Sequence, residues 1–387
     1  MSAISEIADT YLAQTYAHIP VTIVAGKGSL VYDETGKEYI DMGTGIAVNA
    51  FGVSDEVWKE AVIAQLNKVQ HTSNLFYSEP CALLAQHLCE RTGMKRVFFG
   101  NSGAEANECA IKVARKYAAD AYGEARSAIV TLENSFHGRT LTTLAATGQS
   151  HYHELFRPLT PGFIHVPAND LAAMEACFAT GTVAGVLMEC VQGEGGVVAL
   201  EAGFVQGVAA LCERYDVVLM FDEVQTGNGR SGHLYAYEHF GVTPDVVSTA
   251  KGIGGGLPMG ACLLGEKVAQ VLGPGDHGST FGGNPVCCAG ALSVLERIDE
   301  ALLQEVQAKS AYIFETLQNT PGVEAVSGMG LMIGIKTKKP VAEVLSACRE
   351  AGVLCLTAKD KLRLLPALNI PWETLKQAMD IICACVR

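Results

Sequence analysis

The sequence predicts an α/β fold with a mostly parallel sheet flanked by helices, together with a smaller α+β domain. Between about residues 96 and 266, short apolar runs alternate with helical stretches such as residues 104–118. The runs lie at residues 97–99, 128–132, 183–188, 217–221, 246–248 and 261–264. Several of them are apolar throughout, which is typical of strands that helices cover on both faces. Strands that alternate with helices in this way favour a parallel sheet.

The segment before this pattern is predicted to form short strands and one helix. Residues 22–24 and 29–32 have the composition of short strands. Residues 54–69 have the spacing of an amphipathic helix, with Ser54 as its N-cap and Glu56 in its first turn.

The segment after this pattern is predicted to be mixed. One long helical pattern runs over residues 287–317. Two short strands and a helix follow, at residues 323–326, 331–335 and 341–351. We expect an N-terminal segment that packs with the small domain, a large α/β domain and a small α+β domain. Their expected limits are residues 1–50, 51–286 and 287–387.

Charge and apolar patterning narrow the class of protein. The 387 residues carry a formal net charge of −13, which argues against nucleic acid or a membrane surface as a partner. Hydrophobic residues make up 49%, enough for a sizeable buried core. The most apolar long stretch, residues 181–200, contains Glu189, Glu194 and five glycines, a composition that is wrong for a membrane span.

The cysteines and the first ten residues indicate a compartment. The thirteen cysteines include no Cys-x-x-Cys pair and no spacing typical of zinc sites. The first ten residues lack the basic and apolar regions of a signal peptide. We therefore expect reduced, mostly buried thiols in a soluble, cytoplasmic protein without a metal site.

Two predicted strands are followed by residues suited to an anionic cofactor with a basic ring. Ser102 is a good N-cap for the helix after the first run, and Gly103 and Ala104 leave its first N–H groups open to a phosphate. Asp222 ends a buried run, where a carboxylate is costly unless it has a partner. A protonated pyridine nitrogen is one such partner. The alternatives are an ordinary capped helix and an Asp tied into its own loop.

Two further strand ends carry a lysine and an aromatic–arginine pair. Lys251 follows the run 246–248, where partial burial lowers the pKa of an amine and favours imine formation. Phe136 and Arg139 suggest ring stacking beside carboxylate recognition. The alternatives are a solvated loop lysine and a structural aromatic beside a surface arginine. A joint function requires Lys251 and Asp222 to face one cavity on the same side of the sheet.

These residues belong to motifs by which the chain resembles the class III, or ornithine-type, aminotransferases of the fold-type-I pyridoxal-phosphate enzymes. The matching stretches run from residues 41–43 to residues 363–366, nearly the whole chain. The most specific are Asp-Glu-Val-Gln-Thr-Gly-Asn-Gly-Arg-Ser-Gly at residues 222–232 and Ala-Lys-Gly-Ile-Gly-Gly-Gly-Leu-Pro-Met-Gly-Ala at residues 250–261. The resemblance implies pyridoxal 5'-phosphate as the cofactor.

The resemblance also implies a role for each matching residue. Lys251 would hold the cofactor as a Schiff base and carry the proton between substrate and cofactor, and Asp222 would pair with the pyridinium nitrogen. The other cofactor contacts would come from Ser102, Gly103, Ala104, Phe136, Glu223, Val224, Gln225 and Thr280. Thr280, with Ser279, would reach the phosphate of the neighbouring subunit, which implies a homodimer with shared active sites.

The substrates implied by the resemblance are an amino donor and 2-oxoglutarate, with glutamate as product. Substrate contacts would come from Arg139, Glu194, Ser279 and Arg363. Both arginines would anchor carboxylates, and Glu194 would pair with Arg363 when no second carboxylate is bound; a permanent pair is the alternative. Residues 45–46 are Gly-Ile where ornithine aminotransferases usually have Tyr-Ser. The small Gly45 leaves room for an acylated α-amino group on the substrate. The pattern therefore indicates the acetylornithine branch of the family, which implies a place in arginine biosynthesis.

The chain departs from the family pattern at two places, and other functions are alternatives to this one. Residues 52–56 replace the usual Gly-His-x-His-Pro, and Cys190 stands where Pro commonly follows Glu. Within the class, succinylornithine, ornithine or GABA are alternative donors, and an aminomutase is an alternative activity. Outside it, Gly-x-Gly-x-x-Gly at residues 227–232 allows a nicotinamide-dependent oxidoreductase, although intervening residues separate it from its strand. His-x-His-Glu at residues 151–154 is read as a solvated helix start rather than a metal cluster.

Overall fold

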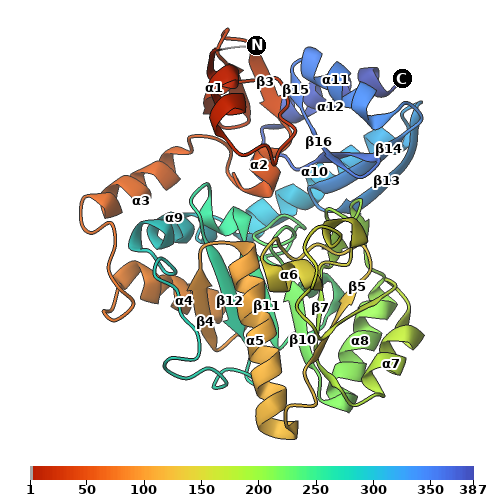
Figure 1. Cartoon of the computed structure of the whole chain (residues 1–387). Helices are drawn as coiled ribbons and strands as arrows, with labels where there is room; N and C mark the ends of the chain where they lie inside the picture. The colour runs from red at the N-terminus through yellow and green to blue at the C-terminus, as the bar shows by residue number, and fades with distance from the viewer. Residues whose placement is uncertain (1–2) are drawn as a thin grey trace.

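The computed structural model describes residues 3–387, and a seven-stranded sheet lies at its centre (Figure 1). In spatial order its strands are β4 (Arg96–Gly100), β12 (Gly260–Leu264), β11 (Val246–Ala250), β10 (Val218–Asp222), β7 (Val183–Met188), β5 (Ala128–Leu132) and β6 (Phe163–Val166). β12 runs antiparallel to both of its neighbours, and the other strands are parallel to one another. The predicted α/β class with a mostly parallel sheet is confirmed.

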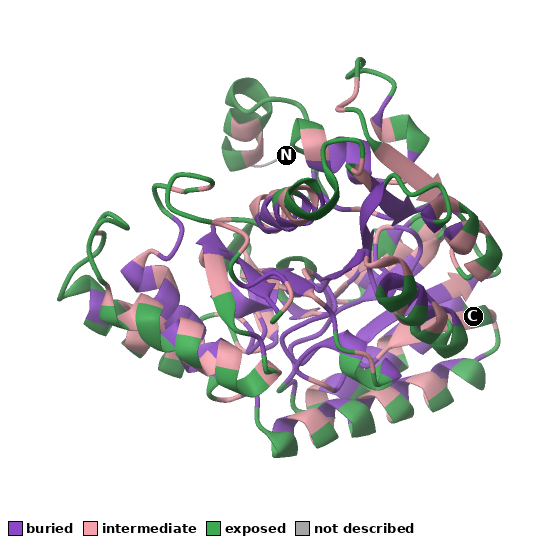
Figure 2. Cartoon of the chain, turned by 90° about the horizontal axis from the view of Figure 1, so that it is seen from below, coloured by how far each residue is buried: buried purple, intermediate pink, exposed green. Residues whose placement is uncertain are grey.

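Helices cover both faces of this sheet, so its strands are buried between them (Figure 2). On β10, Val218 and Met220 pack with α5 (Gly103–Tyr122), whereas Leu219 and Phe221 face the opposite layer. Such alternation follows from the two-residue period of a strand. The helices of the opposite layer and of the edge beside β4 are α7 (Leu171–Phe178), α8 (Ala202–Tyr215), α3 (Glu56–Leu66), α4 (Glu79–Thr92) and α9 (Pro285–Leu295). Within residues 3–387, no helix is both long enough and apolar enough to cross a bilayer.

Smaller sheets lie above the carboxyl ends of the central strands in Figure 1. One contains β1 (Ile23–Lys27), β2 (Leu30–Asp33), β3 (Glu38–Asp41) and β15 (Val353–Leu354). Another contains β13 (Val323–Met329), β14 (Met332–Thr337), β17 (Lys361–Leu364) and β16 (Leu356–Ala358). β15 pairs with β3 in parallel, so segments from both ends of the chain share one sheet. The division at residues 50 and 286 stays a prediction.

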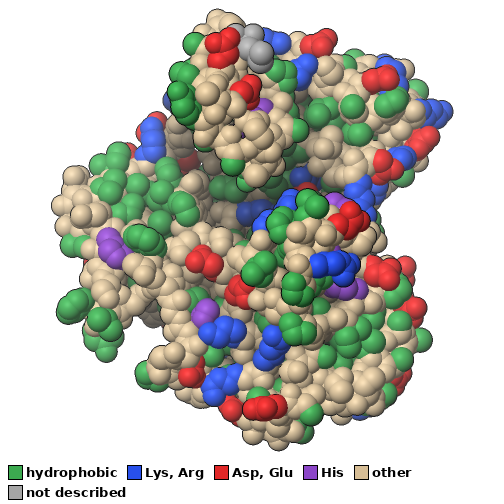
Figure 3. Space-filling model, in the orientation of Figure 1, with side chains coloured by type: hydrophobic (Ala, Val, Ile, Leu, Met, Phe, Trp, Pro, Cys, Tyr) green, Lys and Arg blue, Asp and Glu red, His purple; other side chains and the backbone are tan. Residues whose placement is uncertain are grey.

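The remaining elements are short or lie around these sheets. They are α1 (Ala3–Tyr11), α2 (Thr44–Ala47), α6 (Leu141–Ala146), α10 (Glu300–Gln318), α11 (Val341–Glu350), α12 (Trp372–Val386), η1 (Ser150–Tyr152), η2 (Ala236–Phe240), η3 (Lys251–Gly254), β8 (Val191–Gln192) and β9 (Val198–Ala199). β8 and β9 form an antiparallel pair. Between the smaller sheets and the central one the surface is hollowed (Figure 3).

Two predicted helices differ from the structure at their caps. Helix α3 is capped by Asp55, whose Oδ1 accepts the Trp58 N–H at 2.9 Å, and not by Ser54, which has a φ of 55°. The single helix predicted over residues 287–317 is two helices, because Asp299 caps α10 by accepting the Leu302 N–H at 2.8 Å. In both places the aspartate side chain satisfies an N–H that the first turn of a helix leaves unpaired.

Candidate active site

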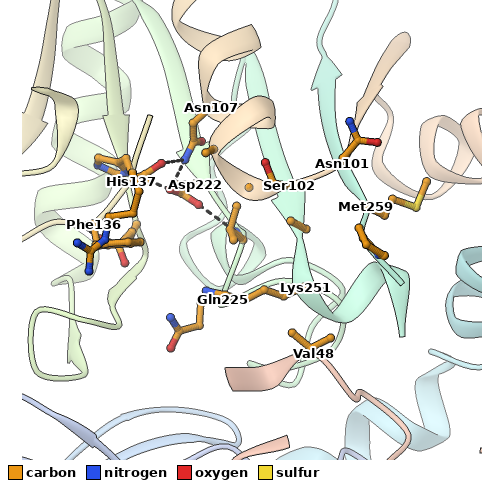
Figure 4. A pocket seen from close by; sticks show the side chains of 18 of the residues that line it. Val48, Asn101, Ser102, Asn107, Phe136, His137, Asp222, Gln225, Lys251 and Met259 are labelled. Carbon is orange, nitrogen blue, oxygen red and sulfur yellow. Dashed lines mark hydrogen bonds and ion pairs between the residues drawn. The ribbon is translucent and has the colours of Figure 1, made fainter. Parts of the chain in front are cut away.

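The carboxyl ends of β4, β5, β10 and β11 surround a cavity of about 450 Å³ (Figure 4). Its polar and aromatic lining includes Asn101, Phe136, Arg139, Asp222, Gln225 and Lys251. Parallel strands bring their carboxyl ends to one edge of the sheet, so residues far apart in the chain meet there. Lys251 and Asp222 line this same cavity, which meets the requirement stated for a joint function.

Asp222 is buried at the end of β10, and three donors hold its carboxylate. Oδ2 lies 2.7 Å from Asn107 Nδ2 and 2.8 Å from His137 Nδ1, and Oδ1 accepts the Val224 N–H at 3.0 Å. Oδ1 accepts one hydrogen bond in the structure, and a carboxylate oxygen has capacity for a second donor from the cavity.

Asn107 and His137 are candidate functional residues that the sequence analysis did not single out. Asn107 Nδ2 also donates to His137 O at 2.8 Å, and its Oδ1 accepts from Ser248 Oγ at 2.5 Å. Asn107 lies on the buried face of α5 beside Ala106 and Cys109. A polar side chain on an apolar helix face needs a buried partner, so this position carried a signal in the sequence. His137 carried none beyond its place next to Phe136.

Lys251 begins η3 directly after β11 with a φ of 50°, in the left-handed region. A residue with a side chain in that region costs of order 1 kcal/mol, and such strain is common at functional sites. Burial lowers the pKa of the Lys251 amine, although the charges of Glu194 and Asp222 oppose this change. In the described part of the chain, Lys251 Nζ makes no hydrogen bond, so the amine is free to react with a molecule in the cavity.

The N-terminus of α5 forms another wall of the cavity. Ser102 Oγ accepts the Glu105 N–H at 3.2 Å, which confirms Ser102 as the predicted N-cap. The first N–H groups of a helix, here those of Gly103 and Ala104, have no partner inside the helix and attract anions. A Cβ added to Gly103 would lie 2.7 Å from Val224 Cγ1. Only glycine therefore lets the helix approach the loop after β10 this closely.

Phe136 and a buried carboxylate form the wall beside β5. The Phe136 N–H donates to Glu189 Oε1 at 2.9 Å, and Glu189 Oε2 accepts the Gly193 N–H at 3.1 Å. Burial raises the pKa of Glu189 to about 7, against the nearby charge of His137, which lowers it. Glu189 lines the cavity and joins the Phe136 loop to the β8–β9 hairpin. This connection was not foreseen from the sequence.

An arginine from β17 reaches the rim of the cavity. Arg363 Nη1 lies 2.5 Å from Glu194 Oε1 and 3.1 Å from Gln225 Oε1. Arg363 is buried, whereas Glu194 is partly exposed on the turn between β8 and β9. Gln225 lines the cavity, so the Glu194–Arg363 pair contacts the cavity through Gln225.

Five predicted site residues do not line the cavity: Glu194 and Arg363, which contact it through Gln225, and Glu223, Ser279 and Thr280. The Glu223 carboxylate accepts from Thr226 Oγ1 at 2.5 Å and from the Tyr237 N–H at 2.8 Å, away from Lys251. Burial raises the pKa of Glu223 to about 7. Thr280 is exposed, and Ser279 Oγ accepts from Asn101 Nδ2 at 3.2 Å. Within one chain, Ser279 and Thr280 do not join the residues around Lys251.

The Gly-x-Gly-x-x-Gly stretch at residues 227–232 does not form a dinucleotide-binding turn. No helix begins at Gly232; the chain continues through a loop to η2. Arg230 within it is buried, and its Nη1 donates to Pro366 O at 2.5 Å and to Leu331 O at 3.2 Å. A Rossmann fingerprint requires these glycines between a strand and the start of a helix. This stretch instead ties the loop after β10 to the C-terminal sheet.

Comparison with known proteins places the chain in a family. The family model described as aminotransferase class-III matches residues 11–386. The acetylornithine aminotransferase of Haemophilus ducreyi is 51% identical over 381 residues, 98% of this chain and 97% of that protein. The succinylornithine transaminase of Salmonella newport is 43% identical, with 100% of this chain and 97% of that protein covered. The crystal structure of the ornithine aminotransferase from Toxoplasma gondii matches with a TM-score of 0.95 at 30% identity, covering 99% and 94% of the two chains.

Fold and site together define a fold-type-I pyridoxal-phosphate enzyme. The chain belongs to the class III aminotransferases, and its cofactor is pyridoxal phosphate. When bound, this cofactor supplies an aldehyde that condenses with amines and a ring that takes up electrons. The residues around the cavity fit it, since they offer a helix N-terminus open to an anion, a carboxylate already fixed by three donors, and a free amine.

Proposed function

We propose that this aminotransferase moves the ω-amino group of N2-acetylornithine to 2-oxoglutarate, giving the semialdehyde and glutamate. The observation that carries the proposal is the presence of arginines on two sides of one cavity. Arg139 lines it, and Arg363 reaches it through Gln225. Both substrates carry an α-carboxylate, and 2-oxoglutarate carries a second one, so two guanidinium groups suit this pair of substrates.

We infer the roles of the other residues from their positions. Lys251 Nζ would hold the cofactor and move the proton at the substrate carbon, and Asp222, fixed by Asn107 and His137, would pair with the ring nitrogen. Phe136 would stack on the ring. Contacts to the phosphate and to the ring oxygen come from Ser102, Gly103, Ala104, Val224 and Gln225. Glu223 does not line the cavity and has a supporting role: its carboxylate accepts the Tyr237 N–H and so fixes the backbone of η2.

An acylated donor is favoured by the turn that contains Gly45. Residues 44–47 all have positive φ values, and the turn lies between the Lys251 cavity, which Val48 lines, and a neighbouring cavity of about 580 Å³, which Gly45 lines. A Cβ at Gly45 would meet no atom closer than 3.8 Å. A tyrosine here would fill this space, whereas glycine leaves it for an acyl group. The identity with the Haemophilus acetylornithine aminotransferase supports the same donor.

Single-turnover spectra test this donor assignment. The holoenzyme is mixed separately with acetylornithine, succinylornithine, ornithine and GABA, and loss of the absorbance band of the lysine-bound cofactor is followed over time. We expect acetylornithine to react fastest. Faster reaction with succinylornithine would assign the donor named for the Salmonella relative, and faster reaction with free ornithine or GABA would remove the role given to Gly45.

We also propose a homodimer in which Thr280 completes the phosphate site of the partner subunit. Leu75, Phe76 and Tyr77 are 88%, 70% and 105% exposed. Asn74 Nδ2 joins their loop to the loop of Thr280, by hydrogen bonds to Ser279 O at 3.0 Å and to Gly282 O. Hydrophobic side chains gather over α3 and this loop on one side of the molecule (Figure 3). Large exposed apolar patches mark protein interfaces.

Charge substitutions in this apolar loop are expected to dissociate the dimer. Leu75→Glu combined with Phe76→Glu places two carboxylates where apolar surface would otherwise be buried. Sedimentation velocity should then show monomers that also lose cofactor more readily on dilution. Leu155→Glu is the matched control, because Leu155 is 86% exposed and lies in another loop. A double variant that sediments as the wild type does would remove the proposed interface.

We propose a cytoplasmic location. All thirteen cysteines are free thiols in the structure. Unpaired cysteines in this number are typical of a reducing compartment. The net charge of −13 disfavours binding to nucleic acid or to an anionic membrane surface, so the partners are small-molecule substrates and a second copy of the chain.

A further inference from the structure

Arg139 lies against aromatic rings at the edge of the Lys251 cavity. Its Cζ is 4.1 Å from the centroid of the Tyr152 ring and 5.6 Å from that of the Phe136 ring. The two rings meet edge to face, with 5.9 Å between centroids. Among residues 3–387, no carboxylate pairs with Arg139 and no hydrogen bond takes up its guanidinium. Stacking uses the face of a guanidinium, so the N–H donors along its edge stay available to a carboxylate.

Tyr152 is held in place by the segment that carries it. It is the last residue of η1, and the next residue, His153, is buried. His153 Nε2 lies 2.7 Å from Thr147 O and 2.9 Å from Leu144 O. Both carbonyls belong to α6 or its C-cap, and α6 begins two residues after Arg139. The solvated helix start predicted at residues 151–154 is therefore wrong, because His153 anchors a short 3₁₀ turn.

Arg363 shows the opposite arrangement. Its donor edge is occupied by Glu194 and Gln225. A carboxylate binds Arg363 only after Glu194 is displaced, whereas Arg139 needs no displacement. Arg139 is, however, exposed at the cavity rim, and a long exposed side chain loses rotamer freedom when it binds a ligand. Arg139 therefore binds a carboxylate more tightly if a neighbouring residue already restricts its rotamers before the substrate binds.

We propose that Tyr152 is a positioning residue that makes the site selective for carboxylate substrates, by holding the guanidinium of Arg139 against its ring while the N–H donors stay free. This inference rests on the proposed function, in which Arg139 takes a carboxylate of both substrates. The Tyr152 ring restricts the guanidinium before binding, so less freedom is lost in the complex. Cation–π contacts and the freedom they remove correspond to about three- to tenfold in affinity.

Three variants test the role of Tyr152 in steady-state and binding measurements. Tyr152→Leu removes the ring, and we expect KM for 2-oxoglutarate and for the amino donor to rise about three- to tenfold with kcat within about twofold. Tyr152→Phe keeps the ring and should restore both KM values. Tyr122→Leu is the matched control, because the Arg126 Cζ lies 4.1 Å from the Tyr122 ring, far from the cavity, and both KM values should stay unchanged.

Two further readouts separate positioning from a general structural role. Calorimetric titration of glutarate, a dicarboxylate that cannot react, should show the same loss of affinity in Tyr152→Leu even if the donor assignment is wrong. A simple alkylamine, which has no carboxylate, should react equally fast with the wild type and the variant in single turnover. Unchanged glutarate affinity, equal slowing of the alkylamine, or the same effect in Tyr122→Leu would each overturn the proposal. If Tyr152→Leu does not fold, Tyr152→Gln serves in the same measurements.

Discussion

Lys251→Ala is expected to abolish transamination while leaving the fold intact. Among the residues that the structure describes, 3–387, Lys251 is the only lysine that lines the cavity between the strand ends, so no other lysine of that lining replaces it. Burial lowers the pKa of Lys251, which favours the neutral, nucleophilic form of the amine. Loss of a general acid–base group alone costs about 10²–10⁴-fold. Loss of the covalent hold on the cofactor adds to this, so turnover should fall below detection.

The fold should survive Lys251→Ala because of the side-chain contacts and the backbone conformation of Lys251. In the described part of the chain Lys251 Nζ makes no hydrogen bond, so its removal leaves no unpaired partner. Alanine meets the same left-handed backbone as lysine, so the cost of the φ of 50° does not change much. We expect the free energy of unfolding of the cofactor-free protein to change by only about 1 kcal/mol.

Visible absorbance and circular dichroism check this result together. The purified variant should lack the absorbance band that the lysine-bound cofactor gives, yet its far-ultraviolet spectrum should match the wild type. Lys95→Ala is a suitable control, because Lys95 is exposed and its ion pair with Glu266, at 3.7 Å, lies on the surface. Full turnover by Lys251→Ala would contradict the assignment of this amine.

The sequence predicted the central strands well because burial on both faces leaves a strong local signal. The strands at residues 128–132 and 183–188 were predicted with the limits that β5 and β7 have. The expectation that Asp222 and Lys251 face one cavity followed from a general rule, because the carboxyl ends of parallel strands lie at the same edge of a sheet. Strand β6 was missed, because three of its four residues are only partly buried and one of these three is His165.

Contacts between distant parts of the chain could not be predicted in this way. Asp222 meets Asn107 and His137 across 115 and 85 residues of sequence, and no local pattern encodes such a pairing. The same holds for Tyr152, whose ring reaches Arg139 only because η1 folds back onto α6. Thr280 is a different case. It is exposed in the single chain, and the contact proposed for it is with a second copy of the chain. Motifs therefore located the proposed reacting groups, and the fold brought Asn107, His137 and Tyr152 next to them.

Arg363→Ala is expected to slow the glutamate half-reaction at least as much as the donor half-reaction. Loss of a hydrogen bond between a guanidinium and a substrate carboxylate costs about 1.5–3 kcal/mol, which corresponds to about 10- to 150-fold in kcat/KM. The 2.5 Å contact between Arg363 Nη1 and Glu194 Oε1 shows that the two groups already meet without substrate. If the second carboxylate of 2-oxoglutarate takes the place of Glu194, this substrate depends on Arg363 most.

Single-turnover rates of the two half-reactions, measured separately, decide between a switch and a permanent pair. Glu194→Gln is the complementary variant, because it keeps the shape of the side chain and removes its charge. A switch predicts that Glu194→Gln spares glutamate and harms the donor, since Arg363 then lacks a partner only when no second carboxylate is bound. A permanent pair predicts that both variants harm both half-reactions equally. Unchanged 2-oxoglutarate kinetics in Arg363→Ala would remove Arg363 from substrate binding, and the second carboxylate would have to be bound elsewhere in the cavity.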